Sequence, residues 1–257
     1  MWCKFYIPFL YFIETRTKTR AKTISWCLIY LFPVLLLFFL FESTKESVEL
    51  WGQLGLTIVL TYNLYELGYI YNDAETIKKE IKPTLRLSEK EIRYYEGNKK
   101  TIYIFRLFVS VVVTFCVYKL GGEFLWYPWL LIPMYAIYNS IRNRLNLLLH
   151  FILVTIRYSS PLVVCTGDLR SIIIFTICFS IINVIERCGE KRFELYYFQR
   201  ELFKNHSLLR CRYYLFIFFT SLCVYLNSLS ELSLLIMVMS LYYFVYRLMI
   251  FFMEKIK

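Results

Sequence analysis

Acidic side chains recur at seven-residue intervals in the first third of the chain, at Glu66, Asp73 and Glu80. A helix turns about 100° per residue, so these three positions share one helix face. Because an ionisable group inside an apolar run is costly unless it meets a cavity or a partner, we expect Glu66 to face a bundle interior. Carboxylates at this spacing can hold Mg²⁺, which binds one or two of them together with substrate phosphates. The alternative is a solvated helix end, in which Glu75 and Lys79 form an ordinary i,i+4 ion pair.

A second polar segment, residues 186–195, follows an apolar run and is rich in charged side chains. Lys191 and Arg192 are suited to phosphate recognition, because Arg binds phosphate as a planar fork and Lys binds it as a point charge. The alternative is a basic cluster that only fixes the orientation of the neighbouring helix. A smaller basic pair, Arg142 and Arg144, follows another apolar run.

Long apolar runs must position these polar segments. Of the 257 residues, 58% are hydrophobic and 20% are aromatic, whereas a soluble domain rarely exceeds about half apolar. Since a helix needs about 20 apolar residues to cross a bilayer, we predict an all-α, polytopic bundle of about eight transmembrane helices. No linker divides the chain, so we predict one domain over residues 1–257. The apolar run at residues 1–13 is too short to cross and is predicted to form an interfacial helix. The predicted spans are residues 24–41, 50–71, 101–118, 124–139, 147–165, 171–185, 213–229 and 232–253.

Lysine and arginine are distributed unevenly between the two sides of this predicted bundle. With eight spans, the segments on the side of both termini hold 25 of these residues and the opposite segments hold 4, with Arg106 inside a span. Basic residues concentrate on the cytoplasmic side of membrane proteins, so we predict cytoplasmic N- and C-termini. Arg157 counts on the opposite side, at the end of the fifth span, unless that helix breaks near Ser159-Ser160-Pro161. The net charge of +11 follows from this topology, and nucleic-acid binding is disfavoured because the charge is spread over loops between spans.

The residues after the second predicted span resemble a known motif. Asn72 and Asp73 are similar to the start of the first aspartate-rich motif, N-D-x-x-D-x-x-x-D, of the UbiA superfamily of membrane prenyltransferases. Glu80 stands at the last acidic position of that motif. Thr76 replaces the middle acid, and Glu75 stands one residue before it. Members of this superfamily usually have nine spans, so a ninth span in addition to the eight counted here stays open.

One branch of the superfamily, the polyprenyl-phosphate phosphoribosyltransferases, resembles this chain more closely. That branch continues the motif with His-Pro-Thr-x-Arg, and residues 82–86 read Lys-Pro-Thr-Leu-Arg. The branch also has a Gly-Lys-Arg-Tyr-Ala-Glu-Leu stretch, which is similar to Gly-Glu-Lys-Arg-Phe-Glu-Leu at residues 189–195. Its Tyr-Ser-x-Arg element is similar to residues 136–142, which read Ala-Ile-Tyr-Asn-Ser-Ile-Arg. The Arg-Pro-Leu-x-x-Gly element and the second aspartate-rich motif of quinone-type prenyltransferases are not evident.

The resemblance implies Mg²⁺-dependent transfer of a 5-phosphoribosyl group from phosphoribosyl diphosphate to a polyprenyl phosphate. The reaction would take place at the cytoplasmic face of the bacterial inner membrane and would make a lipid-linked precursor of cell-surface glycans. The implied metal ligands are Asn72, Asp73, Glu75 and Glu80. The implied catalytic residues are Asp73, Glu80 and Lys191. The implied substrate-binding residues are Glu66, Lys82, Arg86, Arg142, Arg192 and Glu194.

Two other functions stay open at this point. A UbiA-type prenyltransferase would ionise a prenyl diphosphate and alkylate an acceptor, without a ribosyl donor. A non-enzymatic membrane protein would bind lipid or act as a scaffold. The second of these predicts that the charge-neutral changes Asp73→Asn and Glu80→Gln leave function intact.

Overall fold

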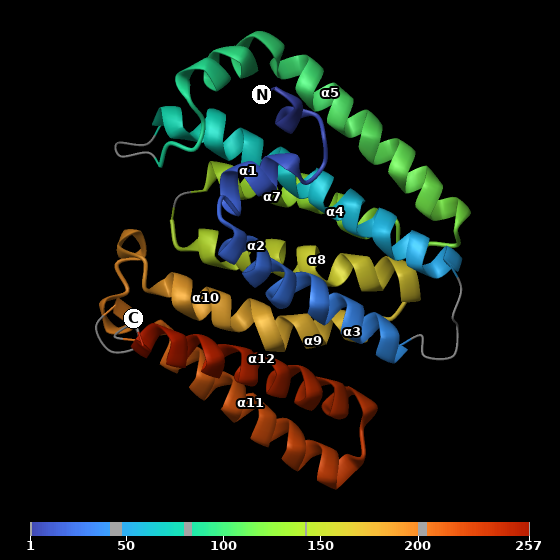
Figure 1. Cartoon of the computed structure of the whole chain (residues 1–257), viewed down its shortest axis with the longest axis vertical. Helices are drawn as coiled ribbons and strands as arrows, with labels where there is room; N and C mark the ends of the chain where they lie inside the picture. The colour runs from blue at the N-terminus through green and yellow to red at the C-terminus, as the bar shows by residue number, and fades with distance from the viewer. Residues whose placement is uncertain (1, 42–47, 80–83, 142, 200–204, 257) are drawn as a thin grey trace. The chain divides into compact units, whose positions relative to one another are not determined.

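The computed structural model describes residues 2–41, 48–79, 84–141, 143–199 and 205–256 (Figure 1). Within these ranges the chain forms helices and no strand, so the predicted all-α class is confirmed. The chain divides into two compact units, Met1–Ile141 with Ile156–Asp168, and Arg142–Thr155 with Leu169–Lys257. No linker in the sequence marks this division, and a single catalytic domain over residues 1–257 stays a prediction.

The first unit begins with short helical elements and then holds the two longest helices of the described chain. Its N-terminal elements are η1 (Cys3–Phe5) and α1 (Leu10–Arg16). A longer helical stretch follows, made of α2 (Arg20–Trp26), the π-helical turn η2 (Cys27–Leu31) and α3 (Phe32–Phe41). The long helices are α4 (Val48–Ala74) and α5 (Glu89–Lys119), with the 3-10 turn η3 (Thr76–Lys79) between them. The unit is completed by α6 (Trp126–Trp129), α7 (Leu131–Ser140) and the second half of α8 (Leu145–Thr166).

The central helix of this unit is α4, whose side chains are buried along most of its length. It packs against α5 and α7 (Figure 1). The start of α5 is a capping box, in which the side chains of Ser88 and Glu91 accept from each other's backbone N–H groups. Large apolar side chains such as Phe108 and Phe115 are exposed on α5, at 63% and 58%. An apolar face of this kind suits contact with lipid.

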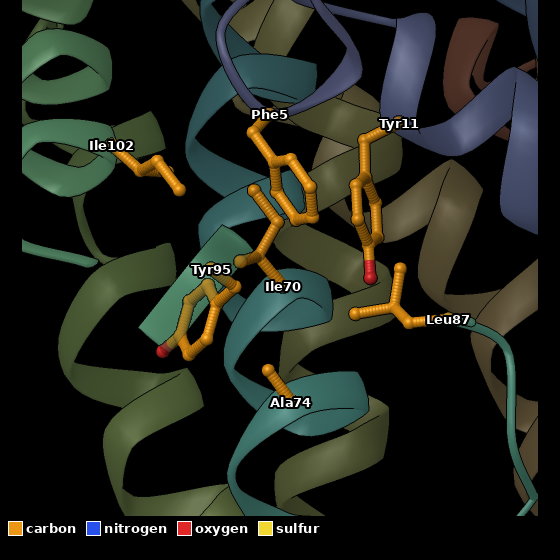
Figure 2. Packing of buried hydrophobic residues seen from close by; sticks show 7 residues of the cluster. All are labelled: Phe5, Tyr11, Ile70, Ala74, Leu87, Tyr95 and Ile102. Atoms are coloured by element: carbon orange, nitrogen blue, oxygen red, sulfur yellow. The ribbon is translucent and has the colours of Figure 1, made fainter. Parts of the chain in front are cut away.

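The N-terminal segment does not form the interfacial helix that its apolar run predicts. Phe9 has a left-handed backbone conformation, with φ of 68°, which separates η1 from α1. Phe5 and Tyr11 are fully buried and belong to one hydrophobic cluster with Ile70 of α4 and Tyr95 of α5 (Figure 2). The predicted interfacial helix over residues 1–13 is therefore wrong. Its aromatic side chains are buried between helices, and this removes more of their apolar area from water than a position at the membrane surface would.

The helix α8 is continuous from Leu145 to Thr166, although Pro161 lies inside it. Proline has no backbone N–H, so the carbonyl of Arg157, four residues earlier, loses its helical partner. The hydroxyl of Tyr30 donates to that carbonyl at 3.4 Å. Arg157 therefore lies within the helix, and its predicted place at the outer end of the fifth span is wrong.

The second unit contains the first half of α8, a helical stretch with a π-helical turn, and a helical hairpin. The stretch consists of α9 (Arg170–Phe175), η4 (Thr176–Ser180) and α10 (Ile181–Cys188). The turn η5 (Lys191–Phe193) comes before the hairpin of α11 (His206–Ser228) and α12 (Glu231–Ile256), which pack along each other. Leu229 adopts a left-handed conformation between the two helices, with φ of 50°, and the chain reverses there.

Several helices have transmembrane character. Within the described ranges, six helical stretches are long and apolar enough to cross a bilayer: Arg20–Phe41, Glu89–Lys119, Leu145–Thr166, Arg170–Cys188, His206–Ser228 and Glu231–Lys255. Although α4 has 27 residues, it carries polar side chains such as Asn63 and Glu66 and is not one of the six. With 10 residues, α7 spans only about 15 Å, half the thickness of a bilayer core of about 30 Å. The spans predicted at residues 50–71 and 124–139, and the total of eight, stay predictions.

Candidate functional site

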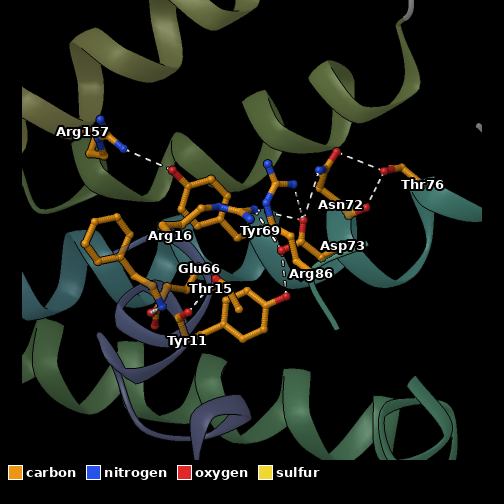
Figure 3. A network of polar contacts seen from close by, with 11 residues as sticks. Tyr11, Thr15, Arg16, Glu66, Tyr69, Asn72, Asp73, Thr76, Arg86 and Arg157 are labelled. Carbon is orange, nitrogen blue, oxygen red and sulfur yellow. Dashed lines mark hydrogen bonds and ion pairs between the residues drawn. The ribbon is translucent and has the colours of Figure 1, made fainter. Parts of the chain in front are cut away.

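A charged cluster surrounds Asp73, which lies fully buried in the last turn of α4 (Figure 3). Nη2 of Arg16, from α1, lies 3.0 and 2.9 Å from the two carboxylate oxygens. Arg86 donates from Nη1 at 3.2 Å, and the Tyr11 hydroxyl donates at 2.9 Å. Burial and the nearby carboxylate raise the pKa of Tyr11, so its hydroxyl stays protonated as a donor. Two guanidinium groups thus face one carboxylate, which leaves positive charge in excess.

Asn72 and Thr76 shape the end of α4 beside this cluster. The Thr76 hydroxyl donates to the backbone carbonyl of Asn72 at 2.5 Å and lies 3.0 Å from its side-chain oxygen. This contact orients the amide, so that its Nδ2 lies 3.5 Å from Asp73. Thr76, which stands where the motif has an acid, therefore acts here as a hydrogen-bond donor.

Glu75 has different partners from Asp73. Lys99 of α5 donates to it at 2.5 Å, Tyr95 donates at 3.2 Å, and Lys78 lies 3.4 Å away. The hydrogen bond from Lys99 lowers the pKa of Glu75, so the carboxylate is ionised at neutral pH. The alternative pair with Lys79 involves a side chain outside the described residues. Asp73 and Glu75 therefore belong to separate ion-pair networks, one toward α1 and one toward α5.

The described side chains around Asp73 do not fit a divalent cation in this arrangement. A metal ligand needs free lone pairs, whereas both oxygens of Asp73 already face Arg16, and Glu75 is held by lysine. Across the described ranges, no three His, Cys, Asp or Glu side chains are grouped so that they could hold a metal ion. Glu80, the predicted distal ligand, lies outside these ranges. Magnesium binding by Asn72, Asp73, Glu75 and Glu80 stays a prediction, and it requires the arginines to release Asp73.

Glu66 lies seven residues before Asp73 in α4 and is fully buried, as its place inside an apolar run predicts. Arg106 of α5 donates to it at 2.7 Å. The backbone N–H groups of Phe9 and Phe12 donate to it at 3.1 and 2.6 Å. The carboxylate thus joins the start of α1 to α4 and α5. Contact between Glu66 and a substrate stays a prediction.

Arg106 has a full set of acceptors although it lies in an apolar helix. Its Nε donates to the carbonyl of Phe5 at 2.7 Å, and its Nη2 donates to the carbonyls of Lys4 and Ile7 at 2.9 and 3.2 Å. Its Nη1 also donates to Asn63 at 2.8 Å. A buried charge is tolerated when it is paired and hydrogen-bonded. Arg106 therefore fixes the N-terminal segment, and with it α1, against α4 and α5.

A cavity of about 310 Å³ lies between α4, α5 and α7 in the same unit. Its wall is mostly apolar and includes Leu64 and Leu107. The ring of Tyr135 lies against Gly68, where a Cβ atom would be only 2.2 Å from it. Also in the wall is Asn139, whose buried Oδ1 accepts no hydrogen bond from the described part of the chain. An apolar pocket with few polar groups is typical of a ligand site, and this one suits a hydrocarbon chain.

The second predicted polar segment lies in the other unit. Lys191 is exposed in η5, and Glu194 is exposed with a left-handed backbone, φ 54°. Arg144 donates to the carbonyl of Phe193 at 3.1 Å and so holds this turn. Outside the described residues lie the side chain of Arg192 and the whole of Glu80, Lys82 and Arg142. The phosphate-binding roles implied for this segment stay predictions.

Tyr11 and Arg16 contact Asp73 directly, yet their spacing in the sequence does not point to it. They stand 62 and 57 residues before Asp73. The one local signal is that Arg16 ends an aromatic run too short to cross a bilayer. A run of that kind can fold back into a bundle instead of lying at the membrane surface.

The arrangement around Asp73 has the composition of an anion-binding cluster, because arginine pairs readily with phosphate oxygens. No protein-family model, curated protein or solved structure matches this chain.

Proposed function

We propose that this chain is a membrane transferase that binds a phosphorylated donor at the end of α4 and transfers its sugar to a lipid phosphate. The pairing of Asp73 with both Arg16 and Arg86 carries the proposal. The two guanidinium groups share one carboxylate, and the buried Nη1 of Arg16 has no partner among the described residues. A phosphate group would supply the missing acceptor and balance the excess charge.

The reaction favoured by the motif resemblance is transfer of 5-phosphoribosyl from phosphoribosyl diphosphate to a polyprenyl phosphate. The bond between ribose C1 and the diphosphate oxygen breaks, and diphosphate leaves with the electron pair. An oxygen of the lipid phosphate supplies the pair that forms the new bond to C1. Arg16 and Arg86 stabilise the charge that develops on the leaving group. The product is a lipid-linked ribose 5-phosphate for cell-surface glycans, made at the bacterial inner membrane.

Asp73 acts in this proposal as a positioning residue. Its buried carboxylate holds Arg16 and Arg86 in place, so little conformational freedom is lost when phosphate binds. The phosphate-binding roles that the resemblance implies for Lys191 and Arg192 stay predictions. The cavity beside Gly68 and Tyr135 would take part of the lipid chain.

The motif resemblance implies Mg²⁺, with Asn72, Asp73, Glu75 and Glu80 as its ligands. That role is an alternative to the positioning role of Asp73, because Asp73 can bind a metal only if Arg16 and Arg86 release it. When bound, the ion would neutralise charge on the diphosphate. Loss of transfer on chelation by EDTA, restored by added Mg²⁺, would favour the metal role, and transfer that survives EDTA would favour the positioning role.

The direct test uses the purified protein in lipid nanodiscs with Mg²⁺, labelled phosphoribosyl diphosphate and polyprenyl phosphate. We expect label to appear in the lipid fraction. Arg86→Gln should lower the rate at least about tenfold, because a hydrogen bond to a charged group is worth about 1.5–3 kcal/mol and 1.36 kcal/mol is tenfold in rate. Arg93→Gln is the matched control, since Arg93 is exposed on α5.

Other outcomes would contradict the proposal. Absence of lipid-linked label, with the wild type indistinguishable from Asp73→Ala, would refute it. Diphosphate release from a prenyl diphosphate without a ribosyl donor would instead support a prenyltransferase. A non-enzymatic lipid-binding protein is the second candidate, and the ion pairs that already satisfy Asp73 favour it. That function would leave lipid binding intact in Asp73→Asn.

A further inference from the structure

Arg157 has an unusual environment in the middle of α8. Its guanidinium lies 4.5 Å from the ring centre of Tyr65 and 5.0 Å from that of Tyr158. Its Nη1 donates to the Tyr69 hydroxyl at 3.4 Å, which is a long hydrogen bond (Figure 3). Its Nε is buried without an acceptor, and no acidic side chain of the described chain forms an ion pair with it. The aromatic rings therefore hold the group in place but do not neutralise its charge.

Arg106 and Arg157 differ in their counter-charges and in their hydrogen-bond acceptors. Arg106 has Glu66 as a counter-charge and three backbone carbonyls as acceptors. Arg157 has neither, although it also lies in a helix apolar enough to cross a bilayer. A charged side chain in such a helix is costly and is by default the mark of a functional site.

Tyr69 connects Arg157 to the cluster around Asp73. Arg16 also contacts Tyr69, because its guanidinium lies 4.1 Å from the centre of the Tyr69 ring (Figure 3). Arg157, Arg16 and Arg86 are thus linked through Tyr69 and Asp73. Among the described residues, Asp73 is the one carboxylate that pairs with any of these three arginines. This excess of positive charge favours a second anionic ligand, in addition to the phosphorylated donor proposed to bind beside Asp73.

We infer that Arg157 and the Tyr69 hydroxyl bind a phosphate monoester, and that this phosphate belongs to a membrane lipid. The apolar cavity between α4, α5 and α7 favours the lipid source, because Tyr135 in its wall packs on Tyr65 and Tyr69, the two tyrosines of α4 that contact Arg157. The inference rests on the proposed function, in which this lipid phosphate is the acceptor.

The test measures ligand binding, which is separate from turnover. Wild type, Arg157→Gln and Tyr69→Phe are purified in detergent, and their melting temperatures are recorded with added polyprenyl phosphate. Polyprenol, which lacks the phosphate, and inorganic phosphate are the two comparison ligands. Wild type should be stabilised by polyprenyl phosphate much more than by either comparison ligand. Arg157→Gln should raise the apparent Kd for the lipid phosphate about tenfold or more, and Tyr69→Phe should raise it less.

The melting temperatures without ligand distinguish a binding role of Arg157 from a purely structural one. If Arg157 is an unneutralised binding group, Arg157→Gln should melt at or above the wild-type temperature without ligand. If Arg157 only fastens aromatic rings together, the same change should lower the melting temperature and leave ligand affinity unchanged, which would refute the inference. Equal stabilisation by inorganic phosphate would refute the lipid source. Arg93→Gln, an exposed change in the same unit, should match the wild type in every measurement.

Binding and transfer can fail independently. Lipid phosphate that binds through Arg157 without accepting label would refute the ribosyl transfer but keep the inference. Transfer with an unchanged KM for the lipid in Arg157→Gln would keep the proposed function and refute the inference.

Discussion

Glu66 and Arg106 form the most completely satisfied polar pair in the first unit. Both side chains are fully buried, and they meet at 2.7 Å. The pair also holds the backbone of the N-terminal segment, because Glu66 accepts from N–H groups of α1 and Arg106 donates to carbonyls of η1. Breaking such a pair from one side is far more costly than its net contribution, because it leaves the other charge buried and unpaired.

We expect Glu66→Gln to destabilise the protein strongly. Removing one partner of a buried ion pair typically costs about 3–5 kcal/mol, and the glutamine keeps only part of the hydrogen bonding. Thermal unfolding in detergent measures the change, with Glu49→Gln as the control, since Glu49 is exposed in the first turn of the same helix. Equal melting temperatures for the two variants would show that Arg106 does not depend on Glu66.

At the scale of elements, the close approach of α4 and α7 depends on one glycine. A Cβ atom at Gly68 would lie 2.2–2.5 Å from the ring of Tyr135, which is far inside van der Waals contact. At Gly55, in the same helix, no atom lies within 4 Å of such a Cβ. Tyr135 in turn packs on Tyr65, which holds Arg157, so this contact links the cavity wall to the arginine.

We expect opposite results from alanine at these two glycines. Gly68→Ala should destabilise by about 1–3 kcal/mol, because it overpacks the contact with Tyr135. Gly55→Ala should be neutral or stabilise by up to about 1 kcal/mol, because alanine is the better helix former. Melting temperatures of the two variants in the same detergent give the comparison. A stable Gly68→Ala protein would mean that α7 can move away from α4 freely.

At the scale of the whole molecule, the distribution of basic residues predicts the orientation in the membrane. The helix α5 has 31 residues and is about 46 Å long, enough to place its two ends on opposite sides of a bilayer. Lys90 lies near one end, in the segment predicted to be cytoplasmic, and Lys119 lies at the other end. Both side chains are exposed.

We therefore expect opposite labelling of single cysteines at these two lysines. In a background without the eight native cysteines, Lys119→Cys should react with a membrane-impermeant thiol reagent in intact cells that express the protein. Lys90→Cys should react only after permeabilisation, because basic segments stay in the cytoplasm. The reverse pattern would contradict the predicted cytoplasmic termini.

The parts of the fold that could be predicted are the helices that continuous apolar runs mark in the sequence. Apolar runs predicted the helices at α5, α8, α11 and α12, because a bilayer-spanning segment is visible as continuous hydrophobicity. The place of Glu66 inside an apolar run predicted its burial. The helix α4 does not meet that criterion, since it buries polar side chains along its length, and α7 does not meet it because it has only 10 residues.

The amino-acid pattern was enough to predict that the chain is helical, that it has transmembrane character, and that Asp73 follows a long apolar run. The side chains that surround Asp73 could not be predicted in this way. Arg16 and Tyr11 reach it from more than 50 residues away, and Arg157 reaches Tyr69 from 88 residues away. Helical periodicity reports which side chains share a face of one helix, but not which other helix meets that face. The choice of partner is made by packing, here by Arg106 fastening the N-terminal segment against α4 and α5.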